Sequence, residues 1–238
     1  MMEVLNVGGL CAEVARKAIK HVHLSVLPPE GKVRVAAPLG MGTETIRLFL
    51  ISKLAWIRRQ QGKLRGQERE APREFMNKES HYLWGKRYLL EIQRVESAPS
   101  VEIKPRKLIL KVRRTADPLR CAASLDAWYR QQVRLTASDF IASWQPRLGV
   151  KANRLFVQHM KTKWGGCAPA TGNIRLNTEL AKKPRECLEY IVVHELLHLL
   201  EPTHNERFMV LMDRHLPQWR QFRAVLNRLP VRHETWAY

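Results

Sequence analysis

Paired cysteines are missing from this sequence, and so are long apolar runs. The four cysteines, Cys11, Cys121, Cys167 and Cys187, are widely spaced and form no C-x-x-C pair. This scatter argues against a disulfide framework and is typical of a protein from a reducing cytoplasm. No apolar run approaches 18 residues, which excludes a membrane-spanning helix, and the first residues lack the pattern of an export signal. We therefore expect a cytoplasmic protein with no membrane partner.

Acidic residues are scarce relative to basic ones. The 238 residues include 41 Lys and Arg against 22 Asp and Glu, which gives a formal net charge of +19 and a pI near 10.3. Such a charge attracts polyanions, so nucleic acid, or a protein bound to it, is a candidate partner. A solvated basic surface explains the charge equally well, and no motif of a nucleic-acid reader accompanies it. The charge alone leaves nucleic-acid association open.

The first half of the chain, residues 1–115, is predicted to be an N-terminal β-rich region with one helix. Apolar residues alternate there with polar ones, as in half-buried strands. The expected elements are a hairpin over 19–36, a helix from 43 to about 61 ended by Gly62, a polar linker over 62–80, and strands around 88–92, 101–103 and 108–112. From Lys104 to Arg114, basic side chains alternate with apolar ones. One face of that sheet should therefore be strongly positive.

The second half, residues 116–238, is predicted to mix helices with a small sheet. Asp117 and Pro118 open a long amphipathic helix that Gly149 ends. The expected elements are that helix to about Arg147, a strand over 155–157, a hairpin around 160–177, a helix from Pro184, and a terminal helix from Pro217. The chain is thus expected to be an α+β protein, long enough to hold one large domain or two small ones.

Three histidines and one glutamate form the most informative pattern in the chain. His194, Glu195 and His198 make a His-Glu-x-x-His motif, and His204 follows six residues later. Residues i and i+4 share one face of a helix, with backbones about 6 Å apart, so both imidazoles can reach one ion. Glu195 follows the first histidine and can contact a water activated by the metal without being a ligand itself.

A third ligand requires the chain to turn after the motif. An α-helix continued straight from His198 would carry residue 204 past the ion, because each residue advances the helix by 1.5 Å. Pro202 disfavours helix at Glu201, so the helix should end near Leu200 or Glu201 and let His204 return. Three protein ligands with an open fourth position are typical of catalytic zinc rather than structural zinc. We therefore predict Zn²⁺ as the cofactor, with histidines that merely satisfy core hydrogen bonds as the alternative.

The hairpin around 160–177 is the candidate edge for an extended peptide, which an exposed strand can bind through its main chain. Trp164 and Lys163 beside it, and Tyr190 before the motif, are candidate substrate-binding residues, although Trp164 and Tyr190 also suit core packing. Cys167 is a weaker candidate as a soft metal ligand. A helix bearing the motif, an amphipathic helix before it and a small antiparallel sheet together form a zincin-like plan.

Four segments in this order resemble the YgjP-like metallopeptidases, relatives of the SprT-like proteases. They are KTKWGGC over 161–167, GNIRLN over 172–177, YIVVHELLHLLEPTHNERF over 190–208, and LPQW over 216–219. The resemblance extends from the early hairpin to the terminal helix. It implies a zincin-like metallopeptidase domain over 116–238, with His194, His198 and His204 as zinc ligands and Glu195 as catalytic base. The family pattern usually has Ser where this chain has Gly166, so no role is assigned to that hydroxyl.

The sequence therefore predicts a zinc metallopeptidase that hydrolyses peptide bonds with a metal-activated water. The SprT-like relatives include proteases of DNA-bound proteins, which by analogy suggests nucleic-acid-associated proteins as substrates. Two alternatives stay open: a nucleic-acid-binding protein with a structural zinc site, and a zinc amidohydrolase of a small substrate. Tyr190, His215 and Arg207 are candidates for stabilising the oxyanion, and Asp213 is a candidate for orienting a ligand histidine.

Overall fold

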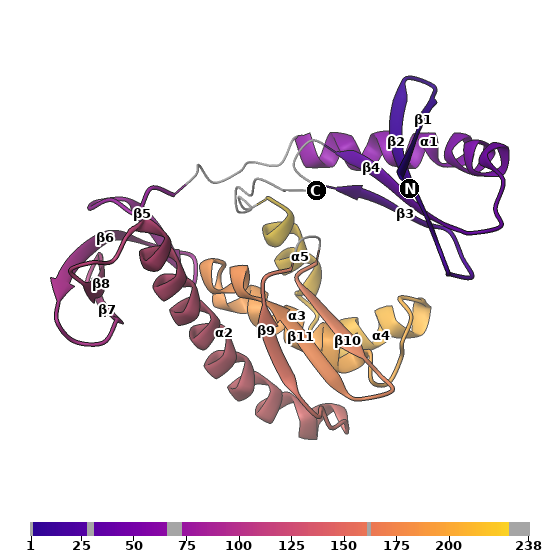
Figure 1. Ribbon diagram of the computed structural model, residues 1–238. Coiled ribbons are helices and arrows are strands. Elements are labelled where there is room, and N and C mark those ends of the chain that lie inside the picture. The colour runs from indigo at the N-terminus through magenta and orange to yellow at the C-terminus, as the bar shows by residue number, and fades with distance from the viewer. Residues whose placement is uncertain (1, 28–30, 66–72, 161–162, 229–238) are drawn as a thin grey trace. The chain divides into compact units, whose positions relative to one another are not determined.

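A computed structural model describes residues 2–27, 31–65, 73–160 and 163–228 (Figure 1). Its contacts divide the chain into two compact units, one of Met1–Glu70 with Pro230–Tyr238 and one of Ala71–Leu229. The expected boundary between residues 115 and 116 lies inside the second unit. Within the described residues, no helix has the length and apolar character needed to cross a membrane.

The first unit is a four-stranded sheet covered by one helix. Its elements are β1 (Met2–Val7), β2 (Leu10–Lys17), β3 (His23–Leu27), β4 (Lys32–Pro38) and α1 (Thr43–Arg65). The strands lie in the order β1-β2-β4-β3, with β2 and β4 parallel. The expected 19–36 hairpin is present as β3 and β4, although its turn at 28–30 lies outside the described residues. The α1 helix passes through Gly62 instead of ending there, so the glycine is not its stop.

Two strands at the start of the chain were not expected from the sequence. β1 and β2 pair as an antiparallel hairpin around Gly8 and Gly9, whose φ angles are +56° and +76°. Glycine adopts these left-handed conformations without steric cost, and two such residues form the tight turn that hairpins favour. The buried sides of both strands join the first core, where Ala12 and Val14 are fully buried.

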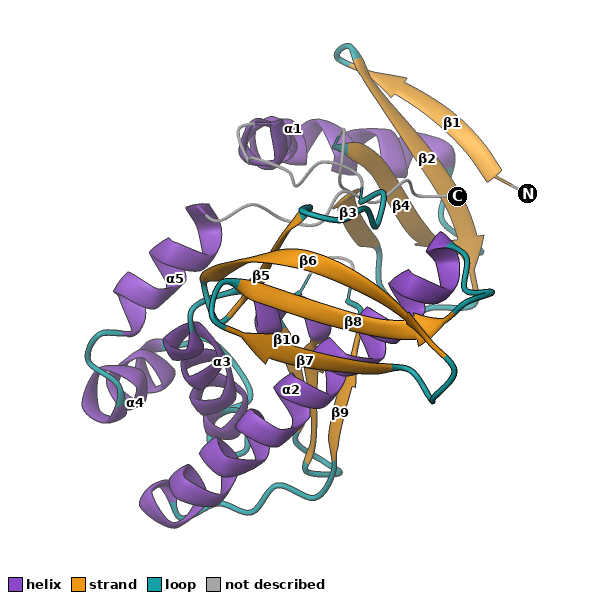
Figure 2. Cartoon of the chain, turned by 90° about the vertical axis from the view of Figure 1, so that its left-hand side faces the viewer, coloured by secondary structure: helices purple, strands orange, loops and turns teal. Residues whose placement is uncertain are grey.

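The second unit begins with a four-stranded sheet that lies across a long helix (Figure 2). The strands are β5 (Ser80–Leu83), β6 (Lys86–Val95), β7 (Ser100–Lys104) and β8 (Lys107–Arg113), in the order β5-β6-β8-β7. The long helix, α2 (Pro118–Leu148), has the predicted ends: Asp117 accepts a hydrogen bond from the Arg120 N–H, and Gly149 closes it at φ +66°. One stripe of α2 is buried in a single large core shared with β6 and β8.

Ion pairs modify the expected positive face of this sheet. Lys107 pairs with Glu91 at 2.9 Å, and Lys111 pairs with Glu102 at 3.2 Å. The hydrogen bond from Lys107 is the main reason that the pKa of Glu91 lies below its ordinary value. These acids come from neighbouring strands, which the sequence of β8 alone does not show. The positive charge of this face is therefore partly neutralised.

The remaining elements surround a small three-stranded sheet. They are β9 (Leu155–Gln158), β10 (Gly165–Ala168), β11 (Asn173–Asn177), the 3-10 turn η1 (Thr178–Lys182), α3 (Arg185–Leu197), α4 (Glu206–His215) and α5 (Trp219–Arg228). The strand order is β10-β11-β9, with the predicted antiparallel hairpin formed by β10 and β11. β9 and β11 are parallel, so this sheet is mixed and not wholly antiparallel as expected. α2 and α3 pack against each other and against this sheet (Figure 1).

The turn between β5 and β6 fixes the segment that leads into α3. The Trp84 N–H donates to the Ala181 carbonyl at 2.8 Å, and the Gly85 N–H donates to the Lys182 carbonyl at 3.3 Å. A Cβ on Gly85 would lie 3.2 Å from the Pro184 ring, and its φ of +76° also favours glycine. Since Pro184 immediately precedes α3, this contact holds the start of the motif helix against the sheet.

Candidate metal centre

The α3 helix is buried along most of its length, which fixes the direction of its histidines. It starts at Arg185 after Pro184, and apolar residues cover almost every side of it. His194 lies in its last turn, and His198 is the residue that ends it, with its N–H bonded to the His194 carbonyl at 3.3 Å. The i, i+4 spacing therefore places both imidazoles on one side of the helix, as expected from the sequence.

The chain turns immediately after the helix and brings His204 back. The N–H groups of Leu200 and Glu201 both donate at 2.9 Å to the Leu197 carbonyl, which tightens the turn before Pro202. The helix ends at Leu197, slightly earlier than predicted, because this turn replaces its last residues. His204 then lies just before α4, whose N-cap Asn205 accepts a hydrogen bond from the Phe208 N–H at 3.0 Å.

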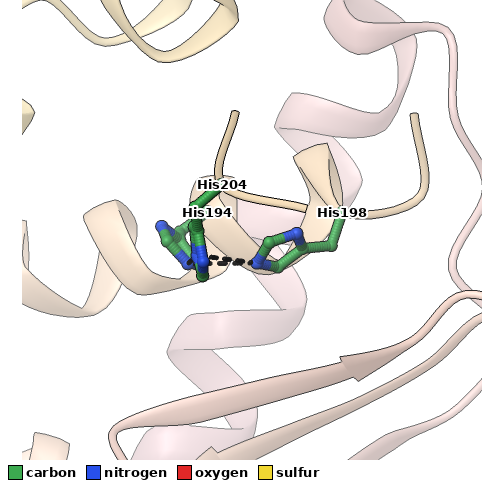
Figure 3. Close-up of side chains that lie close together, drawn as sticks. All are labelled: His194, His198 and His204. Atoms are coloured by element: carbon green, nitrogen blue, oxygen red, sulfur yellow. Dashed lines mark hydrogen bonds between the residues drawn. The ribbon is translucent and has the colours of Figure 1, made fainter. Parts of the chain in front are cut away.

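The three imidazoles converge on one point (Figure 3). The Nε2 atoms of His194 and His198 are 3.2 Å apart, those of His198 and His204 are 3.1 Å apart, and those of His204 and His194 are 2.9 Å apart. Zinc bonded tetrahedrally to imidazole at about 2.0–2.1 Å requires nitrogens roughly 3.3–3.4 Å apart. The observed triangle is slightly tighter than that. The donor set therefore fits one small cation.

The protonation of His198 also suits a metal ligand. Its Nδ1 lies 3.0 Å from the backbone carbonyl of Glu201, and a carbonyl oxygen can only accept a hydrogen bond. The hydrogen of the neutral ring is thus on Nδ1, and Nε2 presents a lone pair to the other two rings. Among the described residues, the buried Nδ1 of His194 has no hydrogen-bond partner. The Glu201 carbonyl, rather than Asp213, is the group that orients a ligand ring.

Burial and mutual proximity favour the neutral forms of His194 and His204. Burial, followed by the charges of His198, His204 and Arg223, lowers the pKa of His194 to about 3. The pKa of His204 is also lowered, mainly by burial and then by His198 and Arg223. Neutral imidazole is the form that binds a metal. Phe208, which is 1% exposed, supports all three rings, with centroids 4.7 to 4.9 Å from its own.

Glu195 lies beside this cluster under the edge strand β10. It is only 5% exposed, and burial raises its pKa to about 8, with the charge of Lys163 and the backbone N–H of Cys167 acting in the opposite direction. A Cβ on Gly165 would lie 2.6 Å from Glu195 Oε1 and 2.8 Å from Ile191 Cγ2. The carboxylate fits under β10 only because residue 165 has no side chain.

The other candidates from the sequence take different positions. Lys163 is exposed and acts on Glu195 through its charge. Trp164 is half-buried against the large core, with Lys183 Nζ 5.8 Å from its ring, and Tyr190 is 5% exposed with its ring edge-on to His194 at 5.9 Å. The Cys167 sulfur is outside the group of converging ligand atoms, and burial raises its pKa to about 11.

Asp213 is not placed as expected. Its carboxylate accepts a hydrogen bond from Trp219 Nε1 at 2.8 Å and pairs with Arg220, so it joins α4 to α5 and does not hold a ligand histidine. Three residues that matter to the site were not found from the sequence: Gly165, Phe208 and Arg223. Gly165 approaches Glu195, Phe208 packs against the three rings, and Arg223 acts through its charge. Only the adjacent glycines at 165 and 166 gave a local signal of close backbone approach.

Comparisons with known proteins identify the family of the chain. No curated protein matches the chain. Among solved structures, the chain is similar to the metallopeptidase zymogen abylysin of Pyrococcus abyssi, with 21% identity, a TM-score of 0.35, and 40% of this chain and 99% of that chain covered. It is also similar to the metallopeptidase zymogen jannalysin of Methanocaldococcus jannaschii, with 20% identity, a TM-score of 0.34, and 38% and 92% covered. The family model of the YgjP-like metallopeptidase domain matches residues 20–229, and the chain belongs to this family of metallopeptidases.

Proposed function

We propose that this protein is a zinc-dependent peptidase in which His194, His198 and His204 hold the ion and Glu195 is the catalytic base. The observation that carries the proposal is the triangle of three Nε2 atoms, 2.9 to 3.2 Å apart, beside a buried carboxylate. A structural zinc site would be closed by a fourth protein ligand. Among the described residues, the group that can hold a metal contains only these three histidines.

The chemistry divides between the ion and the protein. A bound zinc ion supplies Lewis acidity and makes water a better acid, lowering its pKa to about 7. Glu195 takes the proton from the attacking water and returns it to the leaving amine. A carboxyl group whose pKa is raised by burial to about 8 is suited to both transfers near neutral pH. The low exposure of Glu195 also keeps bulk water from competing for its proton.

The edge strand β10 supports a peptide as the substrate. Among the described residues, β10 pairs only with β11, so its other edge offers backbone groups to an extended chain. The first residue of β10, Gly165, lies against Ile191 and Glu195 of α3. Pro169, just after β10, lines a cavity together with Leu199 and Leu200, which follow α3. β10 and α3 therefore run in the same direction. A peptide added antiparallel to β10, the more stable pairing, runs opposite to α3. Its scissile bond would then lie over the histidine cluster.

The test combines metal analysis with proteolysis. Zinc-loaded protein is expected to digest casein, and a chelator should abolish the digestion. Glu195→Gln is expected to bind zinc as the wild type does and to lose activity by about 10²–10⁴-fold. Glu206→Gln, which changes an exposed glutamate in α4, is the control and should remain active. Wild-type activity in Glu195→Gln would show that the assigned base is wrong.

Other functions make different predictions for the same sample. A nucleic-acid-binding protein with structural zinc would bind DNA or RNA in a salt-dependent way and leave casein intact. The net charge of +19 supports that affinity, and it equally supports a peptidase of nucleic-acid-associated proteins. A zinc amidohydrolase of a small substrate would leave casein intact and cleave small amides. The free edge of β10 favours the peptidase, because a small amide has no use for it.

A further inference from the structure

Arg223 places a positive charge at the end of a row of aromatic contacts that leads to the histidine cluster. Its guanidinium lies 6.0 Å from the ring of Trp219 on the same helix, α5. Trp219 stacks on Tyr190 at 6.3 Å, and the edge of Tyr190 meets His194 at 5.9 Å. A row of ring contacts thus leads from Arg223 to His194, one of the candidate ligands.

A neighbouring arginine offers an internal comparison. Arg220 lies 4.5 Å from the same Trp219 ring, but it also forms a two-bonded ion pair with Asp213. Among the described residues, Arg223 pairs with no carboxylate, and it is exposed. Both arginines are on α5 and both contact Trp219. Among these two arginines, only Arg223 has a charge that remains available to a ligand.

The direction of the bound peptide places Arg223 relative to the scissile bond. A peptide antiparallel to β10 has its N-terminal part near Leu199 and its C-terminal part toward the start of α3. Tyr190 is one turn before His194, so the Tyr190–Trp219–Arg223 group lies on the side that the C-terminal part approaches. This placement rests on the proposed peptidase function and on the alignment with β10.

We propose that Arg223 makes the enzyme select peptides with an acidic side chain within three residues after the scissile bond. A carboxylate there meets an unpaired guanidinium, which binds carboxylates in a two-bonded geometry, whereas a lysine would be repelled. The attraction of the carboxylate and the repulsion of the lysine both raise the preference for Glu over Lys. The expected preference for Glu over Lys in kcat/KM is about tenfold, in the range of partly exposed charge pairs.

The experiment uses zinc-loaded full-length protein. Casein cleavage sites are mapped by mass spectrometry, and one site is made as a fluorogenic peptide with Glu, Gln or Lys at each of the three positions after the cut. Wild-type protein and the matched variants Arg223→Gln and Arg220→Gln, which each remove one positive charge from α5, are compared. Arg223→Gln should reduce the Glu-to-Lys ratio to less than about threefold, and Arg220→Gln should keep it near tenfold. Arg223→Glu should reverse the preference.

The outcomes separate the two proposals. If the zinc-loaded wild type cleaves nothing, the proposed function is wrong and the role of Arg223 fails with it. If it cleaves without a charge preference, or if Arg223→Glu keeps the wild-type preference, the peptidase stands and the role of Arg223 is overturned. If Arg220→Gln and Arg223→Gln reduce the ratio equally, the preference comes from the net charge of the protein, and that result also overturns the proposal.

Discussion

The substitution Gly165→Ala tests whether the position of Glu195 depends on a missing side chain. The added Cβ would lie 2.6 Å from Glu195 Oε1 and 2.8 Å from Ile191 Cγ2, whereas ordinary contacts begin at 3.4 Å. Either β10 or the carboxylate must therefore move by about 0.8 Å. A displacement near 1 Å at a catalytic group costs about 10²-fold in rate. We expect kcat/KM of Gly165→Ala to fall by about that factor.

The same overpacking should also lower stability, by about 1–3 kcal/mol. For a unit of this size, each kcal/mol lowers Tm by about 2–4 °C, so a decrease of about 2–12 °C is expected in thermal unfolding. The three atoms nearest to the new methyl group belong to Glu195 and Ile191 and not to a histidine, so zinc content should be unchanged. Activity is measured with casein and the metal by atomic absorption, on the same preparation.

Gly166→Ala is the matched control for this experiment. The nearest atom to a Cβ at residue 166 is Met160 Cε at 4.0 Å, and its backbone is not in the left-handed region. The control adds the same methyl group one residue away and should leave both activity and Tm close to those of the wild type. Equal activity of Gly165→Ala and Gly166→Ala would refute the reasoning. Loss of zinc from Gly165→Ala would show that the substitution disturbs the metal ligands, and that result would also refute the reasoning.

Two further substitutions test the packing of α4 on α5 and the turn between β7 and β8. Asp213→Asn should lower Tm without changing zinc content, because Asp213 bonds Trp219 and Arg220 and no ligand histidine. The hydrogen bonds from Arg220 and then from Trp219 lower the pKa of Asp213 below its ordinary value of 3.8. The ionised carboxylate therefore stabilises the folded protein above that pH, and this stabilisation is lost as the pH falls through the lowered pKa. The difference in Tm between variant and wild type should accordingly shrink as the pH falls toward and below 3.8. Arg106→Gly should stabilise the protein by about 0.5–1 kcal/mol in urea unfolding, since Arg106 has φ +64° and glycine avoids that strain at some entropic cost. Lys104→Gly, in the extended strand beside it, should instead destabilise, and a gain there would contradict this account.

The sequence predicted those features that depend on neighbouring residues. The convergence of His194 and His198 follows from helical spacing, and the ends of α2 follow from Asp117 and Gly149, which act within one turn. Pro202 correctly indicated that the chain turns back before His204. In each case the physical cause lies within a few residues, where a pattern in the sequence can reveal it.

Features that join distant segments could not be predicted in this way. The close approach of Gly165 to Glu195 links residues thirty positions apart. The parallel pairing of β9 with β11 requires a crossover connection, which the alternation of apolar and polar residues within each strand does not reveal. The acids that neutralise Lys107 and Lys111 come from other strands. The β1–β2 hairpin is different, because its Gly8-Gly9 turn is a local signal that the sequence analysis did not use.

The packing of three imidazoles around Phe208 has a consequence for how the metal is exchanged. Phe208 belongs to the large core, so folding of the polypeptide alone positions the three imidazole rings. Binding of the ion therefore needs little further ordering of these side chains. Dialysis against a chelator should therefore give a folded apoprotein with native far-ultraviolet circular dichroism, unlike a zinc finger, which unfolds without its metal. Cobalt added to that apoprotein could then serve as a coloured reporter, whose visible absorption would follow ligand binding at the site directly.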